Sequence, residues 1–197
     1  MNSPINFTSR RRFGVEIELN NADGILKRMD SETKEIPAGS DNVAWIVKKA
    51  SKERVEIACH DYVHNNNYWV IKHDMSCGIE INTPVFKGWF GLKKLLEVVD
   101  ALSEDPDVSA DKTCSLHVHV GTDDLDDYQM ASVIAHYIKC EHVFFDSIPF
   151  HRKNNRYCQM VGLTDWFDTD FLMSHNEIIE GVSQTKYGSI KIGRAHV

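Results

Sequence analysis

Two glutamates lie two positions apart in the segment FGVEIEL, residues 13–19. Glu16 and Glu18 alternate with apolar residues, and this period of two predicts a half-buried β-strand. Both carboxylates then point to the same side of the strand, about 6–7 Å apart along it. Acids this close repel each other and favour a cation, and Mg²⁺ prefers the oxygen ligands that they offer. An exposed strand face with ordinary acids would give the same pattern.

Two histidines repeat this spacing in the segment SLHVHVG, residues 115–121. His117 and His119 alternate with Leu116, Val118 and Val120, so the segment is also expected to form a strand. Two imidazoles on one side of a strand can bind a transition metal or approach a phosphate. By itself the motif is weak, because pairs of exposed or hydrogen-bonded histidines are common.

A third group of polar residues lies in HDMSCGIEINTP, residues 73–84. Glu80 is flanked by Ile79 and Ile81 and therefore lies on the sheet face opposite to them. Asp74 begins a turn-like stretch and could simply cap that turn. If the three strands are neighbours in one sheet, their polar residues converge on one surface, a plausible double-cation site for nucleoside triphosphate chemistry. The converging residues are Glu16, Glu18, Glu80, His117 and His119.

Hydrophobic periodicity predicts the elements that hold these groups. Asp41 can cap the first predicted helix, and Leu96 and Val99 belong to the apolar stripe expected on the second. The polar stretch 20–39 contains Asn-Asn, Asp-Gly and a proline, which favours a loop. We expect helices at 41–53, 91–102 and 125–145, further strands at 55–58 and 68–72, and, from weaker signals, a helix at 170–179 and a strand at 187–190. Their order predicts an α+β protein with a largely antiparallel sheet.

Bulk composition narrows the class of protein. The chain has 197 residues, of which 42% are hydrophobic and 26% charged, as in one soluble globular domain. A net charge of −7 does not favour nucleic-acid binding. The five cysteines form no CxxC pair, which fits reduced thiols in a cytosol. The sequence carries neither a signal peptide nor a membrane-spanning apolar run. We therefore expect a cytoplasmic protein with neither nucleic acid nor membrane as a partner.

Four segments together resemble the amidoligase family, the COOH–NH₂ ligases of the glutamine-synthetase-like superfamily. In chain order they are FGVEIEL, WVIKHDMSCGIEINTPVFKGWFGLKKLLEVVDAL, SLHVHVG and HRKNNRYC. The strongest part is the block from Trp69 to Pro84 with the helix that follows it. Each motif alone is weak, but four in this order are fairly specific. The resemblance implies a glutamine-synthetase-like catalytic fold, an α+β structure with a largely antiparallel curved sheet and helices packed on one face.

The resemblance also implies roles for individual residues. The implied metal ligands are Glu16, Glu18, Glu80, His119 and Asp74. The implied catalytic residues are Glu18, Glu80 and Arg156, and the implied nucleotide-binding residues are His117, His119 and Arg152. The two arginines could equally complement a helix C-terminus.

The implied reaction is ATP-dependent and uses Mg²⁺, with Mn²⁺ as a possible substitute. Transfer of the γ-phosphoryl group would convert a carboxylate into an acyl phosphate, and an amine would then form an amide or peptide bond. The expected partners are carboxylate-bearing and amine-bearing substrates, peptides and proteins among them, while the oligomeric state stays open. Two other interpretations remain: a metal-dependent hydrolase built on the histidine pair, and a non-catalytic module that binds a peptide or nucleotide.

The end of the chain departs from the family pattern. Similar proteins continue to a strand that carries another acid and an arginine, whereas this chain ends soon after KYGSIK. The last six residues, IGRAHV, are identical to the translation of a common sequencing adapter. We therefore expect a single amidoligase-like domain over residues 1–191, incomplete at its C-terminus, and a non-native tail at 192–197. A chain cut in this way could be inactive or unstable.

Overall fold

The computed structural model describes residues 11–20, 26–28, 35–37, 39–58, 66–74, 77–153 and 160 of the chain. The chain divides into two compact units, with the boundary between Gly121 and Thr122. The first unit holds a sheet and two long helices. The second unit begins with a short acidic loop, and its described residues form one long helix and one short one.

A mostly antiparallel sheet forms the body of the first unit. Strand β1 (Arg12–Asn20) lies inside it and pairs antiparallel with β6 (Gly78–Asn82), β7 (Phe86–Lys87) and β8 (Leu116–Val120). Glu16 and Ile17 have partners in both β6 and β8, so these two strands flank β1 on opposite edges. Strand β5 (Trp69–Asp74) pairs antiparallel with β6, and β4 (Val55–Ala58) pairs parallel with β5. The result is an open six-stranded sheet.

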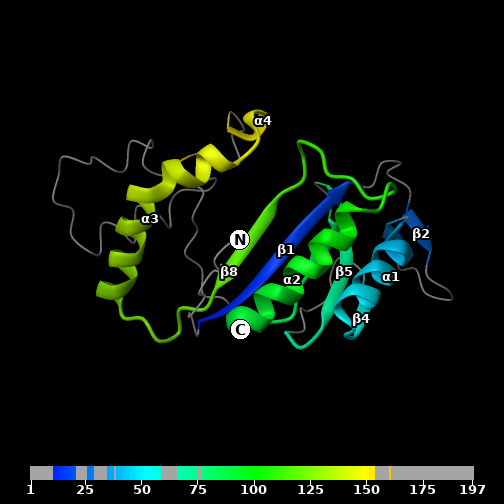
Figure 1. Ribbon diagram of the computed structural model, residues 1–197, viewed down its shortest axis with the longest axis horizontal. Coiled ribbons are helices and arrows are strands. Elements are labelled where there is room, and N and C mark those ends of the chain that lie inside the picture. Colours follow the sequence, from blue (N-terminus) through cyan, green and yellow to red (C-terminus); the bar gives the residue numbers. More distant parts are fainter. Residues whose placement is uncertain are drawn as a thin grey trace, which may run out of the picture. The chain divides into compact units, whose positions relative to one another are not determined.

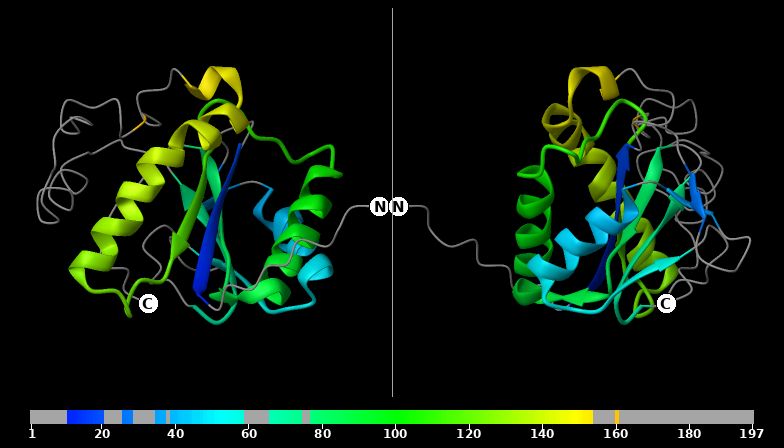
Figure 2. Two further views of the ribbon diagram at one scale, coloured as in Figure 1. Left: turned by 60° about the vertical axis from the view of Figure 1, so that its left-hand side comes forward. Right: turned by 90° about the vertical axis from the view of Figure 1, so that its right-hand side faces the viewer.

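Two helices, α1 (Ser40–Ser51) and α2 (Gly88–Ser103), cover one face of this sheet (Figures 1 and 2). The alternation in β1 turns Val15, Ile17 and Leu19 toward them, and all three join the buried core. Trp69 is fully buried in the same core, where its Nε1 donates a hydrogen bond to Glu53 Oε2 at 2.9 Å. The expected α+β class is confirmed, and in the first unit α1 and α2 both pack on one face of the sheet.

Three local expectations were wrong. The stretch 20–39 contains two short antiparallel strands, β2 (Leu26–Arg28) and β3 (Glu35–Pro37), although their residues show no apolar alternation. Asp41 does not cap α1, because the N-cap is Gly39, in the left-handed conformation with φ 88°, and Asp41 lies inside the first turn. On α2 the buried residues include Val98 and not Leu96 or Val99, which are exposed.

A close contact at the start of α2 determines which side of this helix faces the sheet. Gly91 is buried against Phe86, and a Cβ at that glycine would lie 2.5 Å from the Phe86 Cβ. The backbone of α2 can approach the sheet here because glycine has no side chain. The helix therefore buries Gly91, Val98 and Leu102, and Leu95 packs against the core. Leu95 and Leu102 belong to the expected apolar stripe, whereas Leu96 and Val99 on the same stripe are exposed.

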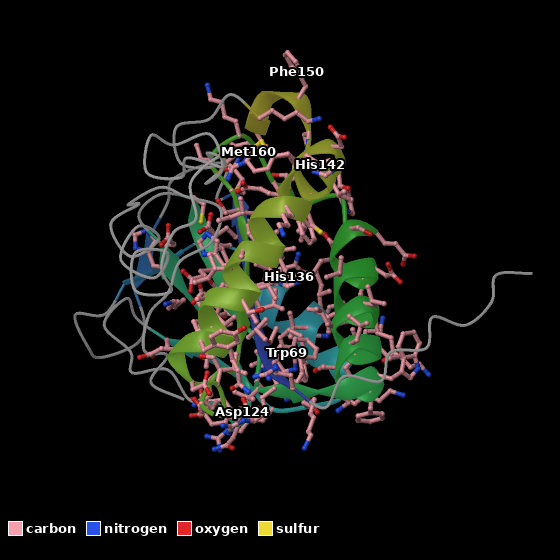
Figure 3. All side chains as sticks on the ribbon, turned by 90° about the vertical axis from the view of Figure 1, so that its left-hand side faces the viewer. Trp69, Asp124, His136, His142, Phe150 and Met160 are labelled. Carbon is pink, nitrogen blue, oxygen red and sulfur yellow. The ribbon has the colours of Figure 1, made fainter. Side chains whose placement is uncertain are left out.

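The second unit is dominated by α3 (Asp127–Ser147). Its N-cap is Asp126, whose side chain accepts a hydrogen bond from the Gln129 backbone N–H at 2.7 Å, and the Gln129 side-chain oxygen in turn accepts one from the Asp126 backbone N–H at 3.1 Å. This reciprocal capping box fixes where the helix begins. Helix α4 (Phe150–Lys153) follows, and Phe150 projects away from it (Figure 3).

Some expectations fall outside the described residues. These are the helix at 170–179, the strand at 187–190 and the non-native tail at 192–197. The single domain over 1–191 stays a prediction. Among the helices that the structure describes, none has the length and apolarity needed to cross a membrane.

Candidate functional site

The register of the sheet places the acids and histidines on the face opposite to α1 and α2. Glu18 is directly opposite Glu80 in β6, and Glu16 is directly opposite His117 in β8. His119 is opposite Gly14, two positions from Glu16, so its imidazole shares this face. Directly opposed residues in paired strands point to the same side of a sheet. The expected convergence of Glu16, Glu18, Glu80, His117 and His119 on one face of one sheet is confirmed, and we call this surface the polar face.

Glu16 binds both histidines. Its Oε2 lies 3.0 Å from His117 Nδ1, and its Oε1 lies 3.3 Å from His119 Nε2. An ionised carboxylate can accept but not donate, so each ring nitrogen donates to it. The hydrogen bonds to the two histidines hold the pKa of Glu16 well below its usual value. The same hydrogen bonds raise the pKa of His117 and His119, against the opposing effect of their partial burial.

Glu18 is a buried carboxylate, with 7% of its surface exposed. Burial raises its pKa, and the negative charge of Asp74 adds to this, whereas His117 and Ser115 act in the other direction. The His117 Nε2 lies 3.7 Å from Glu18 Oε1, and the Glu18 backbone N–H donates to the Ser115 carbonyl at 3.0 Å. His117 therefore lies between Glu16 and Glu18 and contacts both carboxylates.

Glu80 is as buried as Glu18, at 6% exposure, but it has stronger donors. Lys72 Nζ lies 2.9 Å from Glu80 Oε1, and Asn82 Nδ2 donates to the same oxygen at 2.7 Å. Lys72 is directly opposite Glu80 in the neighbouring strand β5. Both donors therefore meet one oxygen of the carboxylate.

Asp74 has the structural role that its sequence context allowed. Its Oδ1 accepts a hydrogen bond from the Cys77 backbone N–H at 3.3 Å, which links the last residue of β5 to the residue before β6. It remains close enough to Glu18 to raise that residue's pKa. Burial, together with the charges of Glu18 and Asp74, also raises the pKa of the Cys77 thiol far above its usual value.

Neither arginine belongs to the described residues of the first unit. Arg152 belongs to α4 in the second unit, where its backbone N–H donates to the Pro149 carbonyl at 2.9 Å. Arg156 lies outside the described residues. The roles that the resemblance implies for both stay predictions.

The donor chemistry of the polar face fits a hard divalent cation. Glu16, Glu18 and Glu80 offer anionic oxygens from adjacent strands, and Glu18 and Glu80 are buried and directly opposed. Within the described part of the chain, however, no group of three or more histidines, cysteines or acids is arranged to hold a metal ion. Glu16 and Glu80 are instead turned to basic or amide partners. A cation at these carboxylates would have to replace some of those contacts.

Two residues of the polar face were missed by the sequence reasoning. Lys72 alternates with the buried Ile71 along β5, and Asn82 follows Glu80 by two positions in β6. The period of two in these strands could therefore have indicated that both side chains lie on the polar face. What the sequence did not indicate is that β5 and β6 lie in a register that brings Lys72 opposite Glu80.

The fold and this face define an α+β protein with a carboxylate- and imidazole-bearing sheet surface. A family model described as "Putative amidoligase enzyme" matches residues 9–172, which span both compact units. The chain belongs to this amidoligase family. No curated protein and no solved structure matches the chain at a significant level.

Proposed function

We propose that this protein is an ATP-dependent carboxylate–amine ligase whose reaction takes place over the polar face. The observation that carries the proposal is the shared face of Glu16, Glu18 and Glu80, in a chain that belongs to an amidoligase family. Three carboxylates on adjacent strands suit a reaction in which divalent cations neutralise a triphosphate.

Each residue of the polar face has a proposed part in binding. Glu16, Glu18 and Glu80 would hold Mg²⁺ or Mn²⁺ through their carboxylates, with His119 and Asp74 as further candidates. His117 and His119 would meet the nucleotide phosphates from β8, because their imidazoles are half-exposed on this face. The cations would supply charge neutralisation at the phosphates when they are bound.

The proposed chemistry has two steps. An oxygen of the carboxylate substrate attacks the γ-phosphorus of ATP, the bond from this phosphorus to the bridging oxygen breaks, and ADP leaves. The product is an acyl phosphate, in which phosphate has become a good leaving group. The amine substrate then attacks the acyl carbon, a C–N bond forms, inorganic phosphate leaves and the amine releases a proton. Small molecules, peptides or proteins can supply either group.

Glu18 is the residue on which to test this proposal. The Glu18→Gln variant keeps the shape of the side chain but removes one negative charge and one strong oxygen ligand. We expect amine-dependent ADP release to fall by two orders of magnitude or more, as when a charge-stabilising group is removed from an active site. Thermal stability should be unchanged or slightly higher, because two opposed carboxylates no longer repel each other.

The control is Glu97→Gln on α2, where an exposed glutamate pairs with Lys93 at 3.8 Å. This variant should release ADP at the wild-type rate. If Glu18→Gln also retained wild-type turnover with a normal melting curve, Glu18 would be a strand acid without a part in the reaction. Zinc that remains bound through dialysis, together with ATP-independent turnover, would instead support the hydrolase interpretation.

A further inference from the structure

Lys72 is a basic side chain on the polar face for which neither the family resemblance nor the proposed chemistry has a role. It lies on β5, directly opposite Glu80, and its Nζ is 2.9 Å from Glu80 Oε1. Its neighbour on the other side is Ala58 of β4, which is small and uncharged. Glu56, the acid of β4 on the same side, is paired with Arg54. The cationic end of Lys72 is therefore directed to Glu80 and not to another acid of the sheet.

When no cation is bound, the contact with Lys72 compensates the buried negative charge of Glu80. Glu80 is 6% exposed, and a buried carboxylate is costly unless a charge or hydrogen bonds compensate it. Lys72 and Asn82 provide this compensation through a single oxygen, Oε1. Asn82 is neutral and nearly fully buried, whereas the Lys72 side chain is a quarter exposed. Of the two donors, Lys72 is the one that carries charge and has room to move.

A divalent cation at Glu80 would change this balance. Two positive groups within about 4–6 Å of each other repel strongly, so a cation bound to the Glu80 carboxylate disfavours an ammonium at the same oxygen. The Lys72 side chain has a flexible four-carbon stem and can leave without moving the strand. The released ammonium would still lie at the polar face, beside the cation, where an anionic ligand of that cation would lie as well.

We propose that Lys72 is an exchangeable counter-ion of the polar face: it neutralises Glu80 until a divalent cation binds there, and then binds a phosphate oxygen of the nucleotide. This inference rests on the proposed function, since it takes the nucleotide and its cation from there. It adds a phosphate-binding residue on β5, on the side of β6 away from the histidines of β8. Lysine suits this role because it acts as a compact point charge for phosphate.

The test separates the two halves of the exchange by measuring binding and not turnover. Mn²⁺ affinity is measured by electron paramagnetic resonance on the full chain, first with Mn²⁺ alone and then with a non-hydrolysable ATP analogue. For Lys72→Met we expect about tenfold tighter binding of Mn²⁺ alone, because a competing positive charge is lost. In the same variant we expect about tenfold weaker binding of the Mn²⁺–nucleotide complex, because a phosphate contact is lost.

Three further variants make the result decisive. Lys72→Arg keeps the charge and should restore both affinities to within a few-fold of wild type. Lys72→Gln is a second neutral variant, and its side chain can still donate a hydrogen bond to Glu80. It should show the two changes in affinity expected for Lys72→Met, so the test can still be made if Lys72→Met folds poorly. Lys93→Met, on the exposed side of α2, removes a lysine from a different surface and should change neither affinity.

Failure of this inference differs from failure of the proposed function. If wild type binds Mn²⁺ and the nucleotide and both neutral variants bind them equally well, Lys72 is a structural partner of Glu80 and the exchange is wrong. Weaker Mn²⁺ binding in the neutral variants would also overturn it, because Lys72 would then be orienting Glu80 and not competing with the cation. If wild type binds neither Mn²⁺ nor the nucleotide, the proposed function fails, and the inference fails with it.

Discussion

Replacing Glu16 by glutamine should destabilise the protein in a way that depends on pH. Glu16 contacts His117 at 3.0 Å and His119 at 3.3 Å, so one substitution removes two charge-assisted contacts. Both imidazoles are about half-exposed, and solvent screens such pairs to about 0.2–1 kcal/mol each. We therefore expect a loss of roughly 0.5–2 kcal/mol in the free energy of unfolding where all three groups are charged.

The pH window follows from the directions of the pKa shifts. The pKa of each histidine is raised from 6.5 in the folded state, so its stabilising contribution is complete below pH 6.5 and is lost as the pH rises through the folded pKa. The pKa of Glu16 is lowered from 4.5, so its contribution is present above pH 4.5 and is lost as the pH falls through the folded pKa. The effect of Glu16→Gln should therefore be largest between about pH 4.5 and 6.5 and small at pH 8.5.

Urea unfolding in metal-free buffer at pH 5.5 and 8.5 measures this difference, with Glu97→Gln as the control. In the Glu16 variant, the imidazole proton resonances of His117 and His119 should also titrate at a lower pH than in wild type. A destabilisation of equal size at both pH values would refute the reasoning. So would histidine titrations that do not move, since they would show that Glu16 does not set the charge of either ring.

Three further predictions concern the core and the cysteines. Ile81 is fully buried between β1 and β5, so Ile81→Ala should lower the free energy of unfolding by about 2–5 kcal/mol in urea titrations. Gly91→Ala should cost about 1–3 kcal/mol, although alanine favours helices, because the new methyl group collides with Phe86; a melting temperature at or above wild type would contradict this. The thiol of Cys77 is buried and has a raised pKa, so iodoacetamide at pH 8 should modify the exposed Cys140 well before it; equal rates would show that Cys77 is accessible.

The sequence was most informative where a strand keeps its period of two. The alternation in residues 13–19 separates the core residues of β1 from Glu16 and Glu18, and the same rule applies to Glu80 and to the histidines. This periodicity is local, because it depends on the backbone geometry of one strand. The orientation of each of these groups on its own strand could be predicted for this reason, whereas their common face also depends on the three strands being neighbours in one sheet.

The partners on that face could not be predicted in the same way. Glu16 and His117 are 101 positions apart in the chain, and their contact depends on β8 returning to pair with β1 in one particular register. The contact between Lys72 and Glu80 depends in turn on the register of β5 and β6. Such registers result from the packing of the whole core and the connecting turns. The prediction that Asp41 caps α1 was wrong because a glycine in the left-handed conformation, Gly39, precedes the helix as its N-cap.

The most direct test of the central claim is the origin of the oxygen atoms in the phosphate that the reaction releases. The full chain is incubated with MgATP and mixtures of carboxylates and amines in water enriched in ¹⁸O, and the phosphate is analysed by mass spectrometry. If a carboxylate oxygen attacks the γ-phosphorus, the fourth phosphate oxygen comes from the carboxylate. ADP should then form when both substrates are present, and the phosphate should carry no oxygen from the solvent. Phosphate that contains one solvent oxygen, or ADP formation that does not depend on carboxylate and amine, would contradict the proposed ligase reaction.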